Sequence, residues 1–563
     1  MPTINGEKYF AHFLSEAGVT HVFFLPAILL KGLGEMENVG IKRIMVHGEK
    51  AAAYMADGYA RVSGRPGVCL AQQIGASNLA AGLRDAYMAS TPLIAVTGGP
   101  NPGSRHRNAY QEVEDFTQFD SVTKFNGHVD NVNRLPDMLR QAFREATSGT
   151  PGPAHLQVPG AHGNALNVDA DLEMLVETNY LQVPAFRAAA TADSVAAAVQ
   201  LLNSAARPIV VAGGGAVYSK AGAELAALAE KLDIPIATSM NAKGVVPDDH
   251  PLAVGVVGNY SRTCANRLVH EADLVLFVGS HTGGQVTNNW TIPARGTRVI
   301  QLDINPSELG RNYPNAVGLC GDARTVLAQI LDASAQPRRN PAWIARVNEL
   351  VAEWREDAES FRNSDAVPLR PERICKEITE ALPEGAVVVS DTGHSGMWSG
   401  TMIDLKASHQ FIRCAGSMGW GFPASLGAKC AAGDRPVVCW TGDGAFYYHI
   451  AELETAARYG LNVVVVVNNN SALNQEIPLI DNAYGGKQTD AGGDMWKFRN
   501  TDFAKVAESF GCVGMRAETP ADVAGALEKA FTLDRPVVID AVSDVNAFAR
   551  RAWSPAGGAG HGH

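Results

Sequence analysis

Short runs of β-branched and aliphatic residues alternate with stretches rich in alanine and leucine along nearly the whole chain. This alternation is typical of βαβ units, in which helices cover both faces of a buried parallel sheet. The pattern occurs three times, within residues 1–165, 190–335 and 368–548. It predicts an α/β fold of three doubly wound parallel-sheet domains, joined by polar or proline-bearing connectors near residues 166–190 and 336–367.

The strand candidates are apolar runs bounded by glycine, proline or aspartate. In the first domain they are residues 19–26, 41–48, 67–73, 92–99 and 153–159. In the second they are 207–215, 235–240, 272–280 and 298–305, and in the third 385–393, 435–444, 461–470 and 535–544. None of these runs approaches the ~20 consecutive apolar residues that a membrane span requires, so no membrane association is expected.

Charge and cysteine content narrow the class of protein further. The 47 basic and 58 acidic side chains give a formal net charge of −11, which makes nucleic acid an unexpected partner. The N-terminus lacks the basic and apolar regions of a secretory signal. The eight cysteines are scattered without a CxxC pair, as is typical of reduced thiols in a cytoplasmic protein.

The clearest candidate for chemistry is in the third domain, where a predicted strand runs into Gly442, Asp443 and Gly444. A helix is predicted from about Ala445. The next predicted strand ends in three consecutive asparagines, the last of which is Asn470. Because parallel strands present their carboxyl ends at one sheet edge, the Asp443 carboxylate and the Asn470 amide oxygen should converge there. Such hard oxygen ligands suit Mg²⁺, and the flanking glycines would let a diphosphate approach. The alternative is a turn and an asparagine-rich loop without a ligand.

The Gly-Asp-Gly segment, its spacer and the asparagines resemble the diphosphate motif of thiamine diphosphate (ThDP) enzymes. The resemblance extends over essentially the whole chain, to the acetolactate synthase-like branch with pyrimidine-binding, central and diphosphate-binding domains in that order. It implies bound ThDP and Mg²⁺. The metal ligands implied are Asp443, Asn470 and Ala472, and the implied cofactor contacts in this region are Gly442, Asp443, Gly444, Ala445 and Asn470.

Two further segments resemble the family's cofactor-binding regions. Residues 47–61 resemble the segment with the catalytic glutamate, here Glu49, which would share a proton with the aminopyrimidine of the cofactor. The alternative for Glu49 is an exposed side chain at a helix N-terminus. Residues 413–428 resemble the segment that bends the cofactor, so Gly416 would accept from its amino group and Met418 would lie between its rings. Met418 could instead fill the core.

Two loops complete the resemblance. Residues 390–398 resemble the loop that holds the diphosphate, which places Gly393, His394 and Ser395 near the phosphates with His394 donating a hydrogen bond. Residues 108–116 resemble a stretch beside the active site, with Tyr110 facing the substrate. Gln111 in that stretch either polarises a substrate carbonyl or caps a loop.

The sequence departs from the family around the expected substrate pocket. Ile28 and Leu29 bring bulky apolar groups where glycines are usual, and Gln72 and Gln73 bring two amides that either contact substrate or satisfy loop backbone. Glu476 lies where some ThDP decarboxylases have a carboxylate, as a proton donor or as a solvated lid residue. Acetolactate synthases have an arginine that holds the acceptor keto acid, and here that position is Gln285. Acetolactate is therefore not the expected product.

The central domain raises the question of another cofactor. Gly213–Gly215 follow a predicted strand, and Asp303, Ile304 and Asp322 match loosely the positions that contact FAD in acetolactate synthases. The GxGxxG fingerprint is absent because position 218 is tyrosine. FAD, the ADP moiety of a coenzyme A substrate, and an empty structural domain all remain open.

Together these features predict a ThDP- and Mg²⁺-dependent lyase or carboligase. It would act beside the carbonyl of a 2-keto acid, a 2-hydroxy ketone or a 2-hydroxyacyl thioester. The alternatives are a 2-keto acid decarboxylase and, outside enzymes, a catalytically silent ThDP-fold regulatory subunit. Because Glu49 and Asp443 belong to different domains, the resemblance implies a cofactor between two chains, with a homodimer as minimal unit and a homotetramer as the expected assembly.

Overall fold

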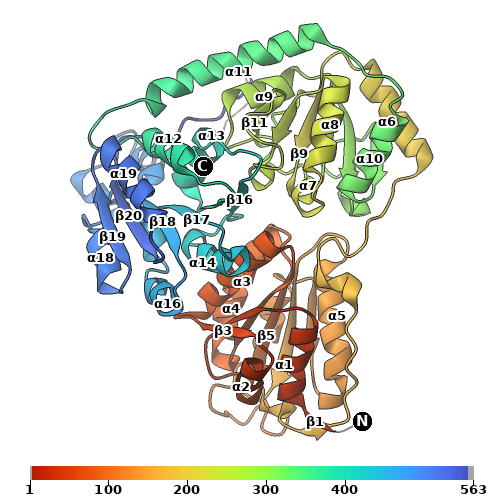
Figure 1. Ribbon diagram of the computed structural model, residues 1–563, viewed down its shortest axis with the longest axis vertical. Helices are drawn as coiled ribbons and strands as arrows, with labels where there is room; N and C mark the ends of the chain where they lie inside the picture. The colour runs from red at the N-terminus through yellow and green to blue at the C-terminus, as the bar shows by residue number, and fades with distance from the viewer. Residues whose placement is uncertain (1–2, 556–563) are drawn as a thin grey trace.

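The computed structural model describes residues 3–555 and has three six-stranded sheets, each with helices packed on it (Figure 1). All neighbouring strands within these three sheets are parallel. The predicted class, three doubly wound parallel-sheet domains, is confirmed. Among the described residues, no helix is long and apolar enough to cross a membrane.

The N-terminal domain has the strand order β3-β2-β4-β5-β7-β6. Its strands are β2 (His21–Phe24), β3 (Lys42–Met45), β4 (Gly67–Ala71), β5 (Leu93–Gly99), β6 (Phe125–His128) and β7 (Pro153–Pro159). Its helices are α1 (Gly6–Glu16), α2 (Leu30–Asn38), α3 (Glu49–Ser63), α4 (Ala76–Met88) and α5 (Leu135–Thr147). A separate antiparallel ribbon pairs β1 (Ile4–Asn5) with β8 (Asp169–Ala170).

The central domain has the strand order β11-β10-β9-β12-β13-β14. Its strands are β9 (Pro208–Ala212), β10 (Ile236–Thr238), β11 (Ala253–Val256), β12 (Leu274–Val278), β13 (Arg298–Asp303) and β14 (Val317–Cys320). Its helices are α6 (Ala192–Ser204), α7 (Gly214–Tyr218), α8 (Gly222–Leu232), α9 (Thr263–Glu271) and α10 (Ala323–Ala333).

The C-terminal domain has the strand order β16-β15-β17-β18-β20-β19. Its strands are β15 (Val387–Ser390), β16 (Gln410–Arg413), β17 (Val437–Gly442), β18 (Val463–Asn469), β19 (Val513–Ala517) and β20 (Val537–Val542). Its helices are α12 (Pro371–Ala381), α13 (Gly393–Met402), α14 (Gly421–Ala432), α15 (Asp443–Tyr447), α16 (Glu452–Tyr459), α17 (Ile477–Ala483), α18 (Phe503–Ser509) and α19 (Pro520–Ala530).

Helix α3 of the N-terminal domain packs directly on helix α14 of the C-terminal domain (Figure 1). Small residues let the two backbones approach. A Cβ on Gly58 would lie 2.0 Å from the Ala424 carbonyl oxygen, and one on Gly427 would lie 1.8 Å from that of Met55. One hydrophobic core continues from Tyr54 in α3 into the C-terminal domain. The two domains on which the predicted cofactor residues lie are therefore one packed unit.

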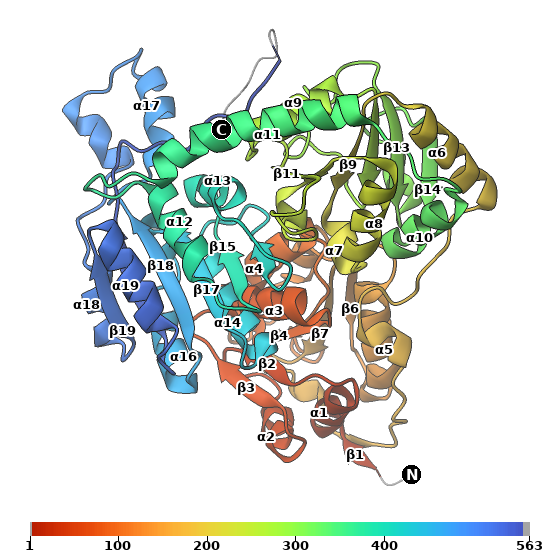
Figure 2. The ribbon, with the colours of Figure 1, turned by 45° about the horizontal axis from the view of Figure 1, so that its top comes forward.

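The second connector is not the polar linker that the sequence predicted. Its residues form α11 (Pro341–Arg362), a helix of 22 residues that runs between the central and C-terminal domains (Figure 2). Trp343, Val347, Leu350, Trp354 and Ala358 are buried on one side of it, at intervals of three or four residues. This spacing gives a helix one apolar face, which packs on α9 and α12. The expected linker was inferred from polar and proline residues, and the helical period of these apolar positions was missed.

Candidate active site

The carboxyl edge of the C-terminal sheet brings Asp443 and Asn470 to neighbouring strand ends. Strand β17 ends at Gly442, and Asp443 is the first residue of α15, two residues earlier than the helix predicted from Ala445. The Asp443 carboxylate is 3% exposed and accepts hydrogen bonds from the backbone N–H of Gly444 (2.7 Å) and of Ala472 (3.1 Å). Burial raises the pKa of Asp443 to about 6. A buried carboxylate of this kind needs a compensating positive charge.

Asn470 supplies the second oxygen. Its Oδ1 is buried and has no hydrogen-bond partner among residues 3–555. The preceding residue, Asn469, contrasts with it, because its amide donates to Asp540 (2.7 Å) and to the Thr501 carbonyl (2.9 Å). Buried polar atoms are nearly always paired, so the unpartnered oxygen after β18 is available to a ligand. Carboxylate and amide oxygens are the donors that Mg²⁺ accepts, and these residues fit that ion.

The predicted diphosphate loop lies beside this edge. Helix α13 begins at Gly393, whose φ of +66° favours glycine. Ser395 is buried, and a Cβ added to Gly442 would lie 3.3 Å from its Oγ. The glycines of the two segments thus lie close together beside the helix that begins at Gly393, the kind of place where a diphosphate binds.

His394 differs from its predicted role as a hydrogen-bond donor to the phosphates. Its Nδ1 lies 2.9 Å from Oδ1 of Asn474, whose amide nitrogen donates to the carbonyls of Val545 and Ala547. Because those carbonyls fix the amide orientation, Nδ1 of His394 bears the hydrogen and donates it to Asn474. Burial lowers the pKa of His394, and the neutral ring presents Nε2 as an acceptor. A donor role toward a diphosphate therefore requires the protonated ring.

Glu49 is the first residue of α3 and is 7% exposed, so it is not the exposed helix-end residue of the alternative interpretation. The side-chain amide of Asn78 donates to Oε2 at 3.1 Å. A Cβ on Gly75 would lie 2.3 Å from Oε1, so glycine is required opposite the carboxylate. No pattern in the sequence identifies Asn78 or Gly75 for this contact, which depends on the packing of α3 against α4.

The segment with Gly416 and Met418 follows β16 without regular secondary structure. Gly416 is exposed and Met418 is half-buried, so both backbone and side chain remain accessible. Asp391, which the sequence analysis overlooked, fixes one end of the segment by accepting from the backbone N–H of Gly419 (3.1 Å) and of Gly421 (2.7 Å). Its signal was an aspartate after a buried strand, the same signal that identified Asp443.

The residues predicted to line the substrate pocket are placed differently from one another. Ile28 and Leu29 are completely buried in the core of the N-terminal domain, where hydrophobic packing accounts for them without a substrate. Gln73 is 2% exposed and donates to the Val113 carbonyl at 3.2 Å, so it satisfies loop backbone, one of the two alternatives for this residue. Gln72 is half-buried. Ile28 and Leu29 were expected to border the reaction centre, but in the structure they are packed inside the N-terminal core.

Two of the remaining predicted residues are exposed, and the third, Gln111, is half-buried. Tyr110 is 85% exposed, and Glu476 is exposed just before α17. Gln111 has a φ of +62°, and its Oε1 is buried without a hydrogen-bond partner among the described residues. That oxygen therefore does not cap the loop, which leaves it free to contact a ligand.

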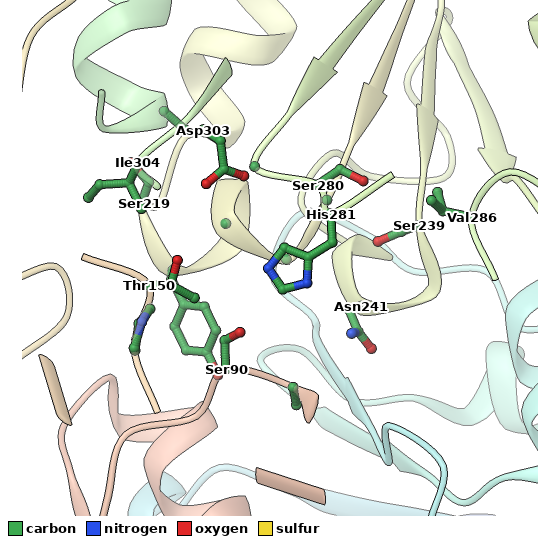
Figure 3. A pocket seen from close by; sticks show the side chains of 18 of the residues that line it. Ser90, Thr150, Ser219, Ser239, Asn241, Ser280, His281, Val286, Asp303 and Ile304 are labelled. Carbon is green, nitrogen blue, oxygen red and sulfur yellow. The ribbon is translucent and has the colours of Figure 1, made fainter. Parts of the chain in front are cut away.

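A large cavity of about 1180 Å³, its open mouth included, lies over the carboxyl edge of the central sheet (Figure 3). Asp303 and His281 point into it, and Ser90 and Thr150 border it from the N-terminal domain. Asp303 is 5% exposed, and burial raises its pKa.

Two of the residues compared with FAD contacts have a structural explanation. Asp322 is bound to Arg187 (2.9 Å) and to Ser219 (2.7 Å). A Cβ on Gly213 would lie 2.2 Å from the Gly279 carbonyl oxygen, so close backbone packing requires that glycine. A Cβ on Gly214 would meet only Asn241, at 3.6 Å, and Gly214 lines the cavity.

Comparison with known proteins identifies the family. Residues 4–119 match the N-terminal TPP binding domain of thiamine pyrophosphate enzymes, residues 195–330 their central domain, and residues 391–541 their C-terminal TPP binding domain. The chain belongs to the thiamine pyrophosphate (ThDP) enzyme family. The prediction of a ThDP-dependent enzyme of the acetolactate synthase-like branch is thereby confirmed. Glu49 and Gln111 lie in the first matched segment, and Gly393, Asp443 and Asn470 lie in the third.

The similar proteins match nearly end to end. A probable acetolactate synthase large subunit of Methanocaldococcus jannaschii is 31% identical over 94% of this ThDP enzyme and 90% of its own length. One of Methanococcus aeolicus is 30% identical over 96% and 92%. The acetolactate synthase large subunit of Corynebacterium glutamicum is 31% identical over 95% and 86%.

Proposed function

We propose that this ThDP enzyme makes or breaks a carbon–carbon bond next to a carbonyl, with Mg²⁺ as its metal. The substrate class is a 2-keto acid, a 2-hydroxy ketone or a 2-hydroxyacyl thioester. The observation that supports this best is the unpartnered Asn470 oxygen at the sheet edge where the buried Asp443 carboxylate lies, in a chain that also has a buried Glu49. A silent regulatory subunit has no chemical reason to keep these three groups together.

The roles of the chain's own residues follow from their surroundings. ThDP supplies, when bound, a nucleophilic carbon and an acceptor for the electron pair of the broken bond. Asp443 and Asn470, with the main chain at Ala472, would hold Mg²⁺. Glu49, fixed by Asn78, would hold or release a proton at the aminopyrimidine nitrogen. Gln111 would donate to, or accept from, the substrate through its free amide.

We further propose that acetolactate is not the product. Position 285, where acetolactate synthases have an arginine, is glutamine, and the residues before it, Gly279–Gly284, include no lysine or arginine. A second keto acid therefore lacks a cation for its carboxylate there. A 2-keto acid decarboxylase is the alternative, favoured by exposed Glu476 as a proton donor. Incubation with pyruvate, acyloins and acyl-CoA compounds, while CO₂ and aldehyde are followed, distinguishes these reactions, and rapid formation of acetolactate from pyruvate would contradict the proposal.

The proposed active unit is a homodimer that associates into a tetramer, with each cofactor between two chains. Exposed apolar side chains support it. They flank Glu49 and the Gln111 loop on the N-terminal domain (Ile74, Tyr110, Val113), and the Asp443 helix and α17 on the C-terminal domain (Tyr448, Leu479). A second copy would cover both patches. Sedimentation velocity with and without ThDP and Mg²⁺ tests it, and an active monomer would refute it.

The cavity over the carboxyl edge of the central sheet has room for a second ligand. We propose that it binds the ADP moiety of FAD or of a coenzyme A substrate, because Asp303 and the open backbone at Gly214 offer groups suited to a ribose and a diphosphate. Thermal melting with ADP, FAD and coenzyme A separates the sources. A shift with FAD alone indicates a flavin, a shift with ADP and coenzyme A indicates a thioester substrate, and no shift with any of them contradicts the proposal.

A further inference from the structure

Three buried charged residues of the N-terminal domain meet the C-terminal domain at the segment with Gly416 and Met418. They are Asp57 and Arg61 in α3 and Asp85 in α4, and we call them the interdomain charge cluster. Asp57 and Asp85 are 0% exposed. Arg61 binds Asp57 through Nε (2.7 Å) and a terminal nitrogen (2.8 Å), and it reaches Asp85 at 3.2 Å. One guanidinium thus balances two buried carboxylates.

Asp85 is turned toward the backbone of the C-terminal domain. It accepts hydrogen bonds from three consecutive N–H groups, those of Ala415 (2.8 Å), Gly416 (3.1 Å) and Ser417 (2.9 Å). Backbone N–H groups that converge in this way form an anion-binding concavity, here occupied by a side chain of the same protein. The segment has no ladder or helix of its own to fix it at these residues.

The geometry of the peptide bond turns this contact into an orientation for the Gly416 carbonyl. The bond between Gly416 and Ser417 is not among the cis peptides, so its C=O points opposite to its N–H. The Ser417 N–H points at Asp85, and the Gly416 carbonyl therefore points away from it. Gly416 is exposed, and a Cβ there would meet only Met88 at 3.6 Å, so the residue is open to an incoming ligand.

The rest of the interdomain charge cluster fixes the two ends of the same segment. Arg61 donates to the Arg413 carbonyl before it, and the indole N–H of Trp420 after it donates to Asp57 at 2.8 Å. The Arg61 guanidinium also lies over the Trp420 ring, 4.6 Å from its centre. Met418 lies between these anchors and is itself only half-buried.

We propose that Asp85 is a positioning residue of this enzyme, which holds the Gly416 carbonyl and the Met418 backbone in the orientation that receives the cofactor. This inference rests on the proposed function, because it takes Gly416 and Met418 as the groups that meet ThDP. Asp85 acts through the backbone, and Arg61, oriented by Asp57, supplies the positive charge that pairs with its buried carboxylate. The segment is thus set before the cofactor arrives rather than ordered by it.

The test variant is Asp85→Asn, whose amide has the same shape but turns an NH₂ group toward N–H donors. The control is Asp404→Asn, which also removes the charge of an interdomain ion pair, with Arg262 at 2.6 Å, but lies at the boundary of the central and C-terminal domains. Hydrogen exchange in the cofactor-free proteins should show the amides of residues 415–417 exchanging at least about 10-fold faster in Asp85→Asn, and unchanged in the control. Calorimetry with Mg²⁺ should show ThDP binding about 10- to 100-fold weaker in Asp85→Asn and unchanged in the control.

The outcomes separate the two proposals. If the wild-type protein does not bind ThDP, the proposed function fails. If it binds ThDP and Asp85→Asn binds equally well, or if amides 415–417 remain protected in that variant, the positioning role is wrong. Should Asp85→Asn not fold, Arg61→Lys takes its place, because lysine keeps the charge but loses the fork to Asp57. The same local loss of protection and of ThDP affinity is then expected, and its absence overturns the inference.

Discussion

The metal edge and the substrate edge of the candidate site differ in how their polar side chains are satisfied. At the metal edge, Asn470 has a buried oxygen that no other residue of the described part of the chain contacts by a hydrogen bond. At the substrate edge, Gln73 is buried and bound to the Val113 carbonyl, while Ile28 and Leu29 are enclosed by hydrophobic packing. The fold thus leaves a polar atom without a partner where the cofactor is expected. At three of the positions expected to meet substrate, the side chain is already bonded or packed within the protein. Residue type alone does not separate the two situations, because an unpartnered Asn and a partnered Gln present the same chemical group.

The largest expected effect is at Glu49. Replacing Glu49 by Gln removes the group that exchanges a proton with the cofactor, and turnover should fall by about 10² to 10⁴, with ThDP still bound. Steady-state kinetics and thermal melting measure the two quantities. Glu7→Gln is the control, since Glu7 is also buried in the N-terminal domain, where it accepts from the Lys31 N–H at 2.8 Å. Turnover unchanged in Glu49→Gln would remove the proposed mechanism.

The neighbouring asparagines after β18 allow a matched test of the metal edge. Asn470→Ala should weaken Mg²⁺-dependent ThDP binding about 10- to 100-fold with little change in Tm, because its oxygen has no partner to lose among the described residues. Asn469→Ala should instead lower the free energy of unfolding by about 1–3 kcal/mol, because it leaves Asp540 short of a hydrogen bond. Calorimetry and denaturant unfolding separate the two losses. Equal effects of both variants on ThDP affinity would count against the metal ligand assigned here.

Gln73 and Gln111, both in the N-terminal domain, sharpen the comparison at the substrate edge. Gln111→Ala should lower kcat/KM about 10-fold with Tm unchanged, the effect of one hydrogen bond lost from the transition state. Gln73→Ala should lower the unfolding free energy by about 1 kcal/mol, because the Val113 carbonyl loses its donor. If instead Gln73→Ala lowers kcat/KM and Gln111→Ala lowers the unfolding free energy, then Gln73, and not Gln111, contacts the substrate.

The smallest expected effect is at Ile28. Ile28→Val removes one methylene from a fully enclosed side chain and should cost about 0.5–1.5 kcal/mol in unfolding free energy, with KM unchanged. Chemical denaturation and steady-state kinetics check it. A selective change in KM among substrates of different size would return Ile28 to the substrate pocket.

The strands show what could be predicted from the sequence. The central strands, such as β9 and β12, are apolar over their whole length because both sheet faces are covered, and their runs predicted them. The strands of the three six-stranded sheets that were missed, β6, β11, β14, β16 and β19, all lie at sheet edges. Each is partly exposed, and β19 is half-buried at four of its five residues, so no apolar run distinguishes it from a loop.

The candidate site divides in the same way. The sequence by itself determined the residues after central strands, Asp443 and Asn470, because a buried strand fixes where its end lies and which edge it reaches. Only the tertiary structure decided the partners that come from another element: Asn78 for Glu49, Val113 for Gln73, and Asp85 for the segment around Gly416. Such contacts depend on how separate helices and loops pack together in space. The period of the hydrophobic residues and the spacing of motifs describe only the order of residues along the chain, so they do not predict these contacts.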